Sequence, residues 1–340
     1  MGLESALDIF INRMKKGGNM VFLIFMVSFL VSFISFPIVI PRLKEAGIIG
    51  KNMNSESQEE IPEMGGLVIA IGFGAGIVAT IFLRTFFDIF LSVSLTPILA
   101  VLSTVLIVVL IGIFDDLISI RQGFKAIMPI FAALPLMAIK EGDSLIKIPG
   151  LEIINFGIFY SLILVPLGIT GAANAVNMLA GFNGLEAGMG IVAIGSLAII
   201  AYLMGQITSL IILIAAFGAL LATLYYNWYP AKILVGDVGT FTIGAVIASS
   251  VIIGNYEAAG IILMIPYMVD FLIKAKNHFP SKNWWGIYKN GKLYCPDSGP
   301  VGLCQLIMRF SGGISERNLV LVLMGIETIF GVIAILIYID

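Results

Sequence analysis

Polar side chains gather in four short clusters along a chain that is otherwise strongly apolar. The clusters are Asp115-Asp116 with Lys125, the segment from Asn174 to Glu186 with Asn177 and Asn183, Gly236-Asp237 with Lys232, and Lys276 with His278. Carboxylate and amide oxygens suit Mg²⁺, which usually takes one or two carboxylates together with phosphate oxygens and water. A lysine supplies a compact positive charge suited to phosphate. The residue types therefore indicate phosphoryl transfer, in which catalysis is mostly positioning and charge neutralisation.

Each cluster also has a plainer explanation when it is taken alone. The Asp115-Asp116 pair is as typical of a solvated helix end as of a catalytic site, and the Asn-rich segment 174–183 is as typical of a hydrogen-bonded helical break. Asp237 after a glycine is a good N-cap for the apolar run that follows. His278 lies in a polar loop, where a histidine needs no special role. The functional interpretation depends on whether the four clusters meet.

The composition of the 340 residues indicates the setting of these clusters. Hydrophobic residues make up 59% and charged residues 12%, whereas soluble domains carry about 25% charged residues, and the mean hydropathy is +1.06. Disorder, a coiled coil and a conventional soluble enzyme are thereby excluded. The formal net charge of −2 provides no basic field for nucleic acid. Two cysteines and one histidine match neither a zinc site nor a disulfide framework.

Ten apolar runs, bounded by charged residues, glycine or proline, approach the length of about 20 residues that crosses a bilayer. They cover 20–40, 65–83, 89–113, 126–139, 157–173, 187–204, 207–227, 239–254, 258–273 and 318–338. The sequence thus predicts an all-α polytopic membrane protein of about ten transmembrane helices, in a single integral membrane domain over residues 1–340. The fourth, eighth and ninth runs are shorter than the others, which is compatible with tilted or partly re-entrant segments. Residues 1–19 combine helically spaced apolar residues with basic ones, which predicts an amphipathic helix on the membrane surface.

The distribution of basic residues predicts the orientation of these spans. The five odd-numbered loops hold 13 of the 19 Lys and Arg residues, so we expect them to face the cytoplasm, with both termini on the opposite side. The basic N-terminal segment is the one contrary feature. All four polar clusters fall in odd-numbered loops, and the longest of these, 274–317, is expected to carry a substrate-binding segment. We therefore predict a multi-pass cell-membrane protein (of the endoplasmic reticulum in a eukaryote) with one active site at the cytoplasmic face.

Three other features are not assigned to that site. Asp270 is expected to reach the membrane interface from the end of the ninth span. Glu327 lies well inside the last span, where a charged side chain is costly and usually has a partner or a role. Trp284 and Trp285 beside Tyr288 are typical of an interfacial aromatic anchor.

Long strings around the polar clusters resemble those of a known enzyme family. The strings are Gly-Ile-Phe-Asp115-Asp116 with the downstream Lys125, Asn174-Ala-Val-Asn177-Met-Leu-Ala-Gly-Phe-Asn183-Gly-Leu-Glu186-Ala-Gly, Val-Gly236-Asp237, Ile61-Pro62-Glu63 and Ser315-Glu316-Arg317-Asn318-Leu319. They are similar to the polyprenyl-phosphate N-acetylhexosamine-1-phosphate transferases. The middle string most resembles the archaeal and eukaryotic branch of dolichyl-phosphate N-acetylglucosamine-1-phosphate transferases. The resemblance covers nearly the full chain in order.

The resemblance implies a ten-helix fold with a cytoplasmic active site, and it implies a reaction. A polyprenyl (dolichyl) phosphate would attack the β-phosphorus of UDP-N-acetylglucosamine, release UMP and leave the lipid-diphosphate sugar that starts the assembly of a glycan, an N-glycan first among the candidates. The implied cofactor is Mg²⁺, with Mn²⁺ as an alternative. The implied partners are UDP-N-acetylglucosamine, the polyprenyl or dolichyl phosphate and the bilayer, and a homodimer is compatible with the family.

Residue by residue, the resemblance assigns three kinds of role. The metal ligands would be Asn177 and Asp237, the catalytic residues Asp115, Asp116 and Lys125, and the substrate-binding residues Glu63, Asn174, Asn183, Lys276 and His278. Lys125 would contact the pyrophosphate, whereas the division of work between the two aspartates on the lipid phosphate stays open. Asn183 would contact the uracil, with Glu63 on the nucleoside side of the pocket.

Two departures from the family pattern bear on the substrate. The loop around His278 lacks the arginines that the family places beside its histidine, so Lys276 or Lys282 is the expected replacement. The bacterial phospho-N-acetylmuramoyl-pentapeptide transferases resemble this chain in the Asp-Asp and Gly-Asp motifs but use several histidines, and this chain has one. The alternatives are the same reaction with another UDP-N-acetylhexosamine or with UDP-N-acetylmuramoyl-pentapeptide, and, from another class, a membrane transporter. Transporters place ionisable residues near mid-membrane, whereas these carboxylates lie at span ends.

Overall fold

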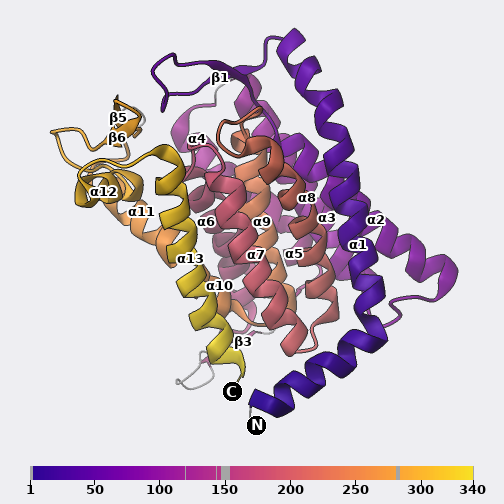
Figure 1. Cartoon of the computed structure of the whole chain (residues 1–340). Helices are drawn as coiled ribbons and strands as arrows, with labels where there is room; N and C mark the ends of the chain where they lie inside the picture. The colour runs from indigo at the N-terminus through magenta and orange to yellow at the C-terminus, as the bar shows by residue number, and fades with distance from the viewer. Residues whose placement is uncertain (1–2, 119, 143, 147–153, 281–283, 340) are drawn as a thin grey trace.

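The computed structural model of this chain is a bundle of long helices whose two termini lie at the same end (Figure 1). It describes residues 3–118, 120–142, 144–146, 154–280 and 284–339, with only the backbone of residues 3–19. The long helices are α1 (Leu3–Glu45), α2 (Gly66–Phe87), α3 (Leu95–Ile118), α6 (Val165–Met178), α7 (Leu185–Leu203), α8 (Ile207–Asn227), α9 (Gly236–Gly254) and α13 (Glu316–Ile339). The shorter helices are α4 (Gln122–Ile127), α5 (Leu134–Ala138), α10 (Glu257–Leu263), α11 (Ile265–Lys276) and α12 (Leu303–Ser311), with a 3₁₀ turn at Met128–Ala133 and a π turn at Tyr160–Leu164.

Eight helices in the described part of the chain are long and apolar enough to cross a bilayer. The predicted ninth span is a bent pair, because α10 and α11 meet at an angle of 56°, and Pro266 in the first turn of α11 has no N–H with which to continue the helix. The predicted fourth span is a succession of short pieces over Gln122–Ala138. The prediction of a helical polytopic membrane protein is confirmed. The count of ten is not, since length and composition support eight spans, or nine with the bent pair.

The first helix extends further than its apolar run predicts, because it accommodates two prolines. The sequence predicts an end at residue 40, but α1 continues through Pro37 and Pro41 to Glu45. Pro37 has no N–H to donate to the Phe33 carbonyl one turn earlier, and the Tyr226 hydroxyl of α8 donates to that carbonyl instead, at 3.3 Å. Neighbouring helices satisfy freed backbone groups in this way inside membranes.

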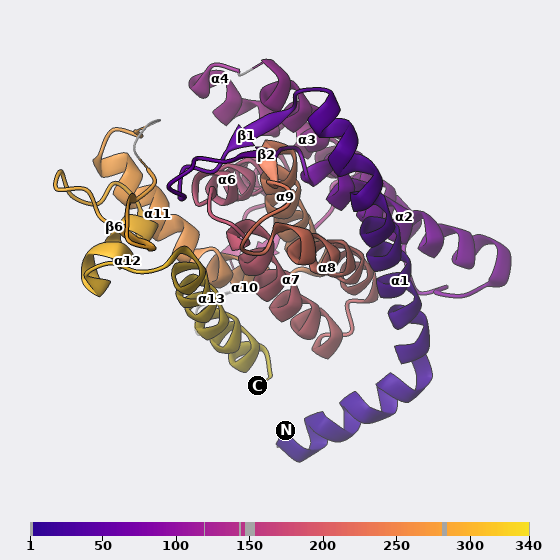
Figure 2. The ribbon, with the colours of Figure 1, turned by 45° about the horizontal axis from the view of Figure 1, so that its top comes forward.

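The central helix is α9, which packs against α2, α3, α6 and α8 (Figure 2). Of its most apolar stretch, 89% is buried inside the protein. Glycines allow its first turn to approach two neighbouring backbones, since a Cβ at Gly66 would lie 2.0 Å from the Gly239 nitrogen and a Cβ at Gly112 would lie 2.5 Å from the Val238 Cα. Small residues permit this kind of close contact between membrane helices. The contacts fix the end of α9 that carries Asp237.

In the part of the chain that the structure describes, three two-stranded antiparallel ribbons, too short for the sequence pattern to predict, join the helices. They pair β1 (Ile49–Lys51) with β2 (Glu60–Pro62), β3 (Leu145–Ile146) with β4 (Ile154–Asn155), and β5 (Ile287–Lys289) with β6 (Lys292–Tyr294). After β2, the Leu234 N–H donates to the Pro62 carbonyl and the Gly65 N–H donates to the Leu234 carbonyl, both at 2.8 Å. These bonds hold Glu63 beside the loop that leads into α9.

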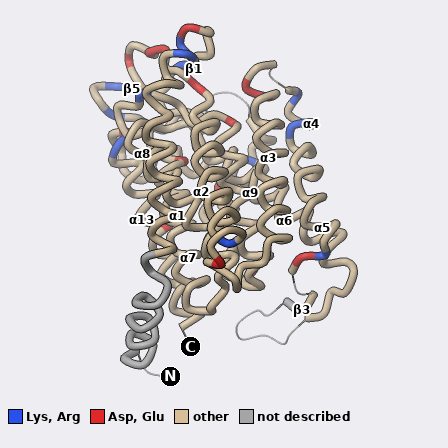
Figure 3. The backbone as a smooth tube through the Cα atoms, turned by 90° about the vertical axis from the view of Figure 1, so that its right-hand side faces the viewer, with Lys and Arg blue, Asp and Glu red and all other residues tan. Residues whose placement is uncertain are grey.

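Charged side chains concentrate at one end of the bundle. Figure 3 shows most of the acidic and basic stretches around β1, β5 and α4, at the end away from the termini, and a largely uncharged middle. This distribution is the one expected when the middle of the bundle faces lipid and its ends face water.

Candidate active site

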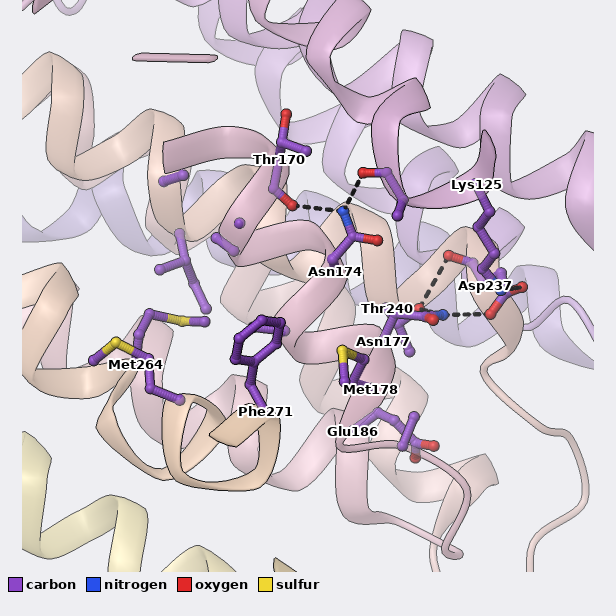
Figure 4. Close-up of a pocket in the computed structure, with 18 of the residues that line it drawn as sticks. Lys125, Thr170, Asn174, Asn177, Met178, Glu186, Asp237, Thr240, Met264 and Phe271 are labelled. Carbon is purple, nitrogen blue, oxygen red and sulfur yellow. Dashed lines mark hydrogen bonds and ion pairs between the residues drawn. The ribbon is translucent and has the colours of Figure 1, made fainter. Parts of the chain in front are cut away.

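One cavity of about 1490 Å³ is lined by residues from all five odd-numbered loops. Its polar part is lined by Glu63, Lys125, Asn174, Asn177, Asn183, Glu186 and Asp237, and its apolar part by Leu164, Leu167, Ile247, Val251, Met264, Met268 and Phe271. Figure 4 shows Lys125 and Asp237 on one side of this space, Met264 and Phe271 on the other, and Asn177 and Met178 between them. Most of the predicted site residues therefore meet in one place.

The first turn of α9 requires the glycine and the second aspartate of the predicted motifs. Gly236 has a φ of +69°, which glycine adopts readily, and a Cβ there would lie 2.8 Å from Asp116 Oδ2. The Asp116 carboxylate accepts hydrogen bonds from the N–H groups of Asp237, at 3.0 Å, and Val238, at 3.5 Å. A carboxylate at a helix N-terminus satisfies free donors and complements the helix dipole. Asp116 thus fixes the backbone of Asp237.

Lys125 lies between two carboxylates. Its Nζ is 2.5 Å from Asp115 Oδ2 and also contacts Asp237 Oδ2, while the Ile120 N–H donates to the other oxygen of Asp115 at 2.8 Å. Burial opposes the charge on Lys125, but the attraction of Asp237 and Asp115 outweighs it and raises the pKa of this lysine above its usual value. The side chain is therefore a permanent positive charge beside acidic groups.

Two asparagines one turn apart on α6 complete this side of the cavity. Asn177 Nδ2 donates to Asp237 Oδ1 and, at 2.9 Å, to Thr240 Oγ1. Asn174 Nδ2 donates to the Ala126 carbonyl at 2.9 Å. The first asparagine joins α6 to α9, and the second joins α6 to α4, the helix that carries the lysine.

Glu63 approaches the same carboxylates from the first loop. Burial raises the pKa of Glu63, the charge of Asp237 raises it further, and Lys125 opposes the shift. A Cβ at Gly50 would lie 2.9 Å from Glu63 Oε2, so the backbone of β1 covers this side chain closely. Glu63 belongs to the acidic cluster as well as to the predicted nucleoside side.

The turn between α6 and α7 is held by two further carboxylates. Glu186 accepts a hydrogen bond from the Gly181 N–H at 2.6 Å. Glu316, at the start of α13, accepts from the Asn183 N–H at 2.8 Å, and the amide nitrogen of Asn183 lies 3.4 Å from the same carboxylate. The turn carries Asn183 to the cavity wall and explains why two carboxylates accompany the asparagine string.

Trp284 is part of the cavity wall, a role that its neighbours in the sequence do not suggest. Its ring packs edge-on against Phe182 with centroids 6.0 Å apart. A Cβ at Gly181 would lie 2.1 Å from that ring, so glycine is needed for this contact. Residues 281–283, including Lys282, lie outside the described residues.

Two predicted substrate-binding residues lie apart from the others. Lys276 and His278 are exposed and are absent from the described lining of the cavity. On α11, residues 268, 271 and 274 follow one another at helical spacing and share the side that faces the cavity. Residue 276 is two positions beyond Lys274 and points elsewhere. The lysine of this helix that lines the cavity is Lys274, which sequence reasoning missed.

Asp270 is fully buried, which differs from the expected interfacial position. Its Oδ2 is 2.9 Å from Lys274 Nζ, and its Oδ1 accepts a hydrogen bond from the Leu303 N–H at 2.7 Å. The spacing of four residues between an acidic and a basic side chain on one helix is the signal that could have found the pair. Glu327 is also fully buried, and among the described residues its carboxyl oxygens have no hydrogen-bond partner.

The donor atoms around Asp237 fit a Mg²⁺ ion that is bound together with a diphosphate. Within the described ranges, no three His, Cys, Asp or Glu side chains converge as an all-protein metal site. Mg²⁺ commonly takes only one or two carboxylates and completes its shell with substrate phosphates and water. Asp237, in contact with the Asn177 amide and close to Asp115 across Lys125, supplies such a partial shell.

Comparison with known proteins agrees with this chemistry. The model of a family described as glycosyl transferase family 4 matches residues 98–255. A protein of Saccharolobus solfataricus, provisionally named as a UDP-N-acetylglucosamine–dolichyl-phosphate N-acetylglucosaminephosphotransferase, is 38% identical over 92% of this chain and 94% of its own length. A Dictyostelium discoideum protein with the same activity in its name is 25% identical over 83% of this chain and 79% of its own. A phospho-N-acetylmuramoyl-pentapeptide-transferase of Lactiplantibacillus plantarum is 31% identical, over 47% of this chain and 53% of its own.

Proposed function

We propose that the substrates of this chain, which belongs to glycosyl transferase family 4, are UDP-N-acetylglucosamine and a polyprenyl phosphate of the dolichyl type. The chain is a membrane transferase of the phosphotransferase type. The names of the relatives that align over most of the chain support this pair of substrates. The product is the lipid-diphosphate N-acetylglucosamine that starts glycan assembly, with an N-glycan as the proposed destination.

The proposed reaction exchanges one phosphorus–oxygen bond for another. An oxygen of the lipid phosphate forms a bond to the β-phosphorus of the UDP-sugar. The bond between that phosphorus and the oxygen shared with the α-phosphate breaks, and this oxygen leaves with UMP. The sugar keeps its own bond to the β-phosphate, so the sugar phosphate moves as one unit.

The observation that carries the proposal is the union of charged and apolar walls in one cavity. Lys125 and Asp237 lie on one side, and Met264 and Phe271 lie on the other (Figure 4). A polyprenyl phosphate has the matching division, with an anionic head and a hydrocarbon chain. Binding sites of this type combine an apolar lining with a few converging polar groups.

The contacts of the two adjacent aspartates support different roles for them. Asp116 accepts two N–H groups of α9, so we assign it to positioning Asp237. Asp115 pairs with Lys125, which lines the cavity, so we assign it to orienting the lipid phosphate and holding its proton. Lys125 contacts the phosphates and offsets their charge.

Asp237 and Asn177 would hold Mg²⁺, with Mn²⁺ as an alternative, and the bound ion would neutralise the negative charge that grows on the departing UMP. Asn183 contacts the uracil and Glu63 the nucleoside side of the donor. Both line the polar part of the same cavity.

The membrane side is also part of the proposal. We assign the active site to the cytoplasmic face, because the loops that line the cavity belong to the group that holds 13 of the 19 basic residues. The termini lie at the opposite end of the bundle (Figure 1).

Release of UMP tests the reaction. The purified protein in detergent is supplied with polyprenyl phosphate, Mg²⁺ and, in separate reactions, UDP-N-acetylglucosamine, UDP-N-acetylgalactosamine or UDP-N-acetylmuramoyl-pentapeptide. We expect UMP release that requires lipid and metal and is fastest with UDP-N-acetylglucosamine. Release with the pentapeptide donor alone would assign the chain to the peptidoglycan reaction. No release with any donor, from protein shown to be folded, would contradict the proposal and direct attention to transport.

A further inference from the structure

A buried ion pair on α11 has no role in the proposed reaction as described so far. It consists of Asp270 and Lys274, whose side chains are 1% and 12% exposed, and it is called here the α11 ion pair. Burying two charges costs free energy that their attraction does not always return. A buried charged pair therefore often adds little to the free energy of unfolding. The groups that it holds in place indicate its role more directly.

On one side, the α11 ion pair holds the end of α6. Lys274 Nζ donates to the carbonyl of Met178, the last residue of that helix. The last four carbonyls of a helix have no partner within it, and a positive charge there also complements the helix dipole. Met178 directly follows Asn177, whose amide contacts Asp237. The lysine thus binds the backbone next to a candidate metal ligand.

On the other side, the α11 ion pair is held by the start of α12. The Leu303 N–H donates to Asp270 Oδ1 at 2.7 Å. A Cβ at Gly302 would lie 2.8 Å from that oxygen and 3.2 Å from the Lys274 Cε. A side chain at position 302 would therefore collide with the pair, so the glycine lets the start of α12 pack closely against both side chains.

We propose that Lys274, oriented by Asp270, is a positioning residue that keeps Asn177 in register with Asp237. It acts through the Met178 carbonyl. The inference rests on the proposed function, because it takes Asp237 and Asn177 as the groups that hold Mg²⁺ on the donor diphosphate. It adds a fifth helix, α11, to the four helices α3, α4, α6 and α9 that carry the predicted catalytic and metal-binding residues.

The test uses two matched double variants and a binding readout. Asp270→Asn with Lys274→Gln removes both charges but keeps an oxygen for the Leu303 N–H and an N–H donor for the Met178 carbonyl. Asp270→Asn with Lys274→Met is the same except that the donor is lost. Calorimetric titration of UDP-N-acetylglucosamine into each protein, with EDTA and then with saturating Mg²⁺, gives the gain in affinity that depends on the metal. Thermal unfolding in detergent reports whether the two variants are equally folded.

We expect the methionine variant to lose about tenfold or more of the Mg²⁺-dependent gain, as is common when a group supporting a metal ligand is removed, and the glutamine variant to stay within about threefold of the wild type. The affinity in EDTA should change little in either. Equal gains in the two variants, whether both normal or both lost, would overturn the inference. A wild-type protein that binds the donor equally with and without Mg²⁺ would overturn the metal assignment itself, and this inference with it.

A single substitution provides an independent test that keeps every polar group. Gly302→Ala places a methyl group against Asp270 and Lys274 and needs no unusual backbone conformation, since Gly302 is extended with φ −162°. We expect a smaller loss of the Mg²⁺-dependent gain, in the same direction as the methionine variant. An unchanged gain in a variant that displaces the pair would contradict the proposal even if the double variants do not fold.

Discussion

Two walls of the same cavity are built in opposite ways. α9 is one unbroken helix, of whose most apolar stretch 89% is buried inside the protein, and its first turn touches the backbones of α2 and α3 through glycines. The opposite wall, α10 and α11, is bent by 56° and leaves large apolar side chains uncovered, with Phe271 42% and Leu272 65% exposed.

The difference separates two requirements of the proposed reaction. The groups on the diphosphate must be held within a fraction of an ångström, which rigid helices in backbone contact achieve. A long hydrocarbon chain needs an apolar wall that is open toward the membrane, and an irregular helix pair provides it because its apolar side chains are not sealed against neighbours. We therefore expect substitutions in the first turn of α9 to change turnover, whereas substitutions in α11 that face the apolar part should change the use of the lipid.

The largest effect is expected at the head of α9. Asp237→Ala should lower UMP release by at least about 10³-fold, because it removes a charged group from the centre of the site and a proposed metal ligand. The measurement is the rate over a Mg²⁺ titration. Asp297→Ala, at an exposed position outside the described cavity lining, serves as the control. Activity that survives across the titration would remove Asp237 from the metal site.

The next effect is expected at the residue that positions this turn. Asp116→Asn keeps one oxygen for the Asp237 N–H but turns an amide group toward the Val238 N–H. We expect the turnover number to fall about 10²-fold, with the KM for the UDP-sugar changed far less. The check is steady-state kinetics with the donor varied. A loss confined to donor affinity would make Asp116 a binding residue.

A smaller effect, on the other substrate, is expected at the bent wall. Phe271→Asn should raise the KM for the polyprenyl phosphate about tenfold, because a polar side chain replaces apolar surface worth about 1.5 kcal/mol. Phe271→Leu keeps the wall apolar and is the matched control. The two substrates are varied separately in the kinetic assay. A change in the donor KM instead would contradict the division between the two walls.

The smallest effect concerns stability and pH. Since burial and Asp237 raise the pKa of Glu63, the folded state favours its protonated form. The stability that the protonated Glu63 side chain contributes is fully present below the ordinary pKa range of glutamate. It is lost as the pH rises through the raised pKa. Glu63→Gln should therefore unfold at a higher temperature than the wild type at about pH 7, by a few degrees, and at the same temperature at about pH 4. Equal differences at both pH values would show that ionisation of Glu63 is not the cause.

Much of the fold could be predicted because a bilayer imposes a simple rule on sequence. The run 207–227 coincides with α8, and the run 89–113 corresponds to α3, which begins six residues later and ends five residues later than the run. Two of the three short runs, 126–139 and 258–273, are the irregular segments, whereas the third, 239–254, is the regular and buried α9. Length alone could not separate these cases, because the run 239–254 omits the first three residues of α9, a regular helix of 19 residues.

The candidate site could be predicted where neighbouring residues carry the signal. The strings around Asp115, Asn177 and Asp237 led to residues that contact Lys125 or one another. The four-residue spacing from Asp270 could have identified Lys274 as part of an ion pair. Its contact with a backbone carbonyl 96 positions earlier could not have been predicted, because every residue type has a carbonyl.

The fate of the donor β-phosphorus tests the central claim most directly. UDP-N-acetylglucosamine labelled with radioactive phosphorus at the β position is incubated with the protein, polyprenyl phosphate and Mg²⁺, and the mixture is partitioned between water and organic solvent. Transfer of the sugar phosphate predicts that the label moves into the organic phase while unlabelled UMP appears in the water. Label that stays in the water as UDP while the sugar alone reaches the lipid would contradict the account.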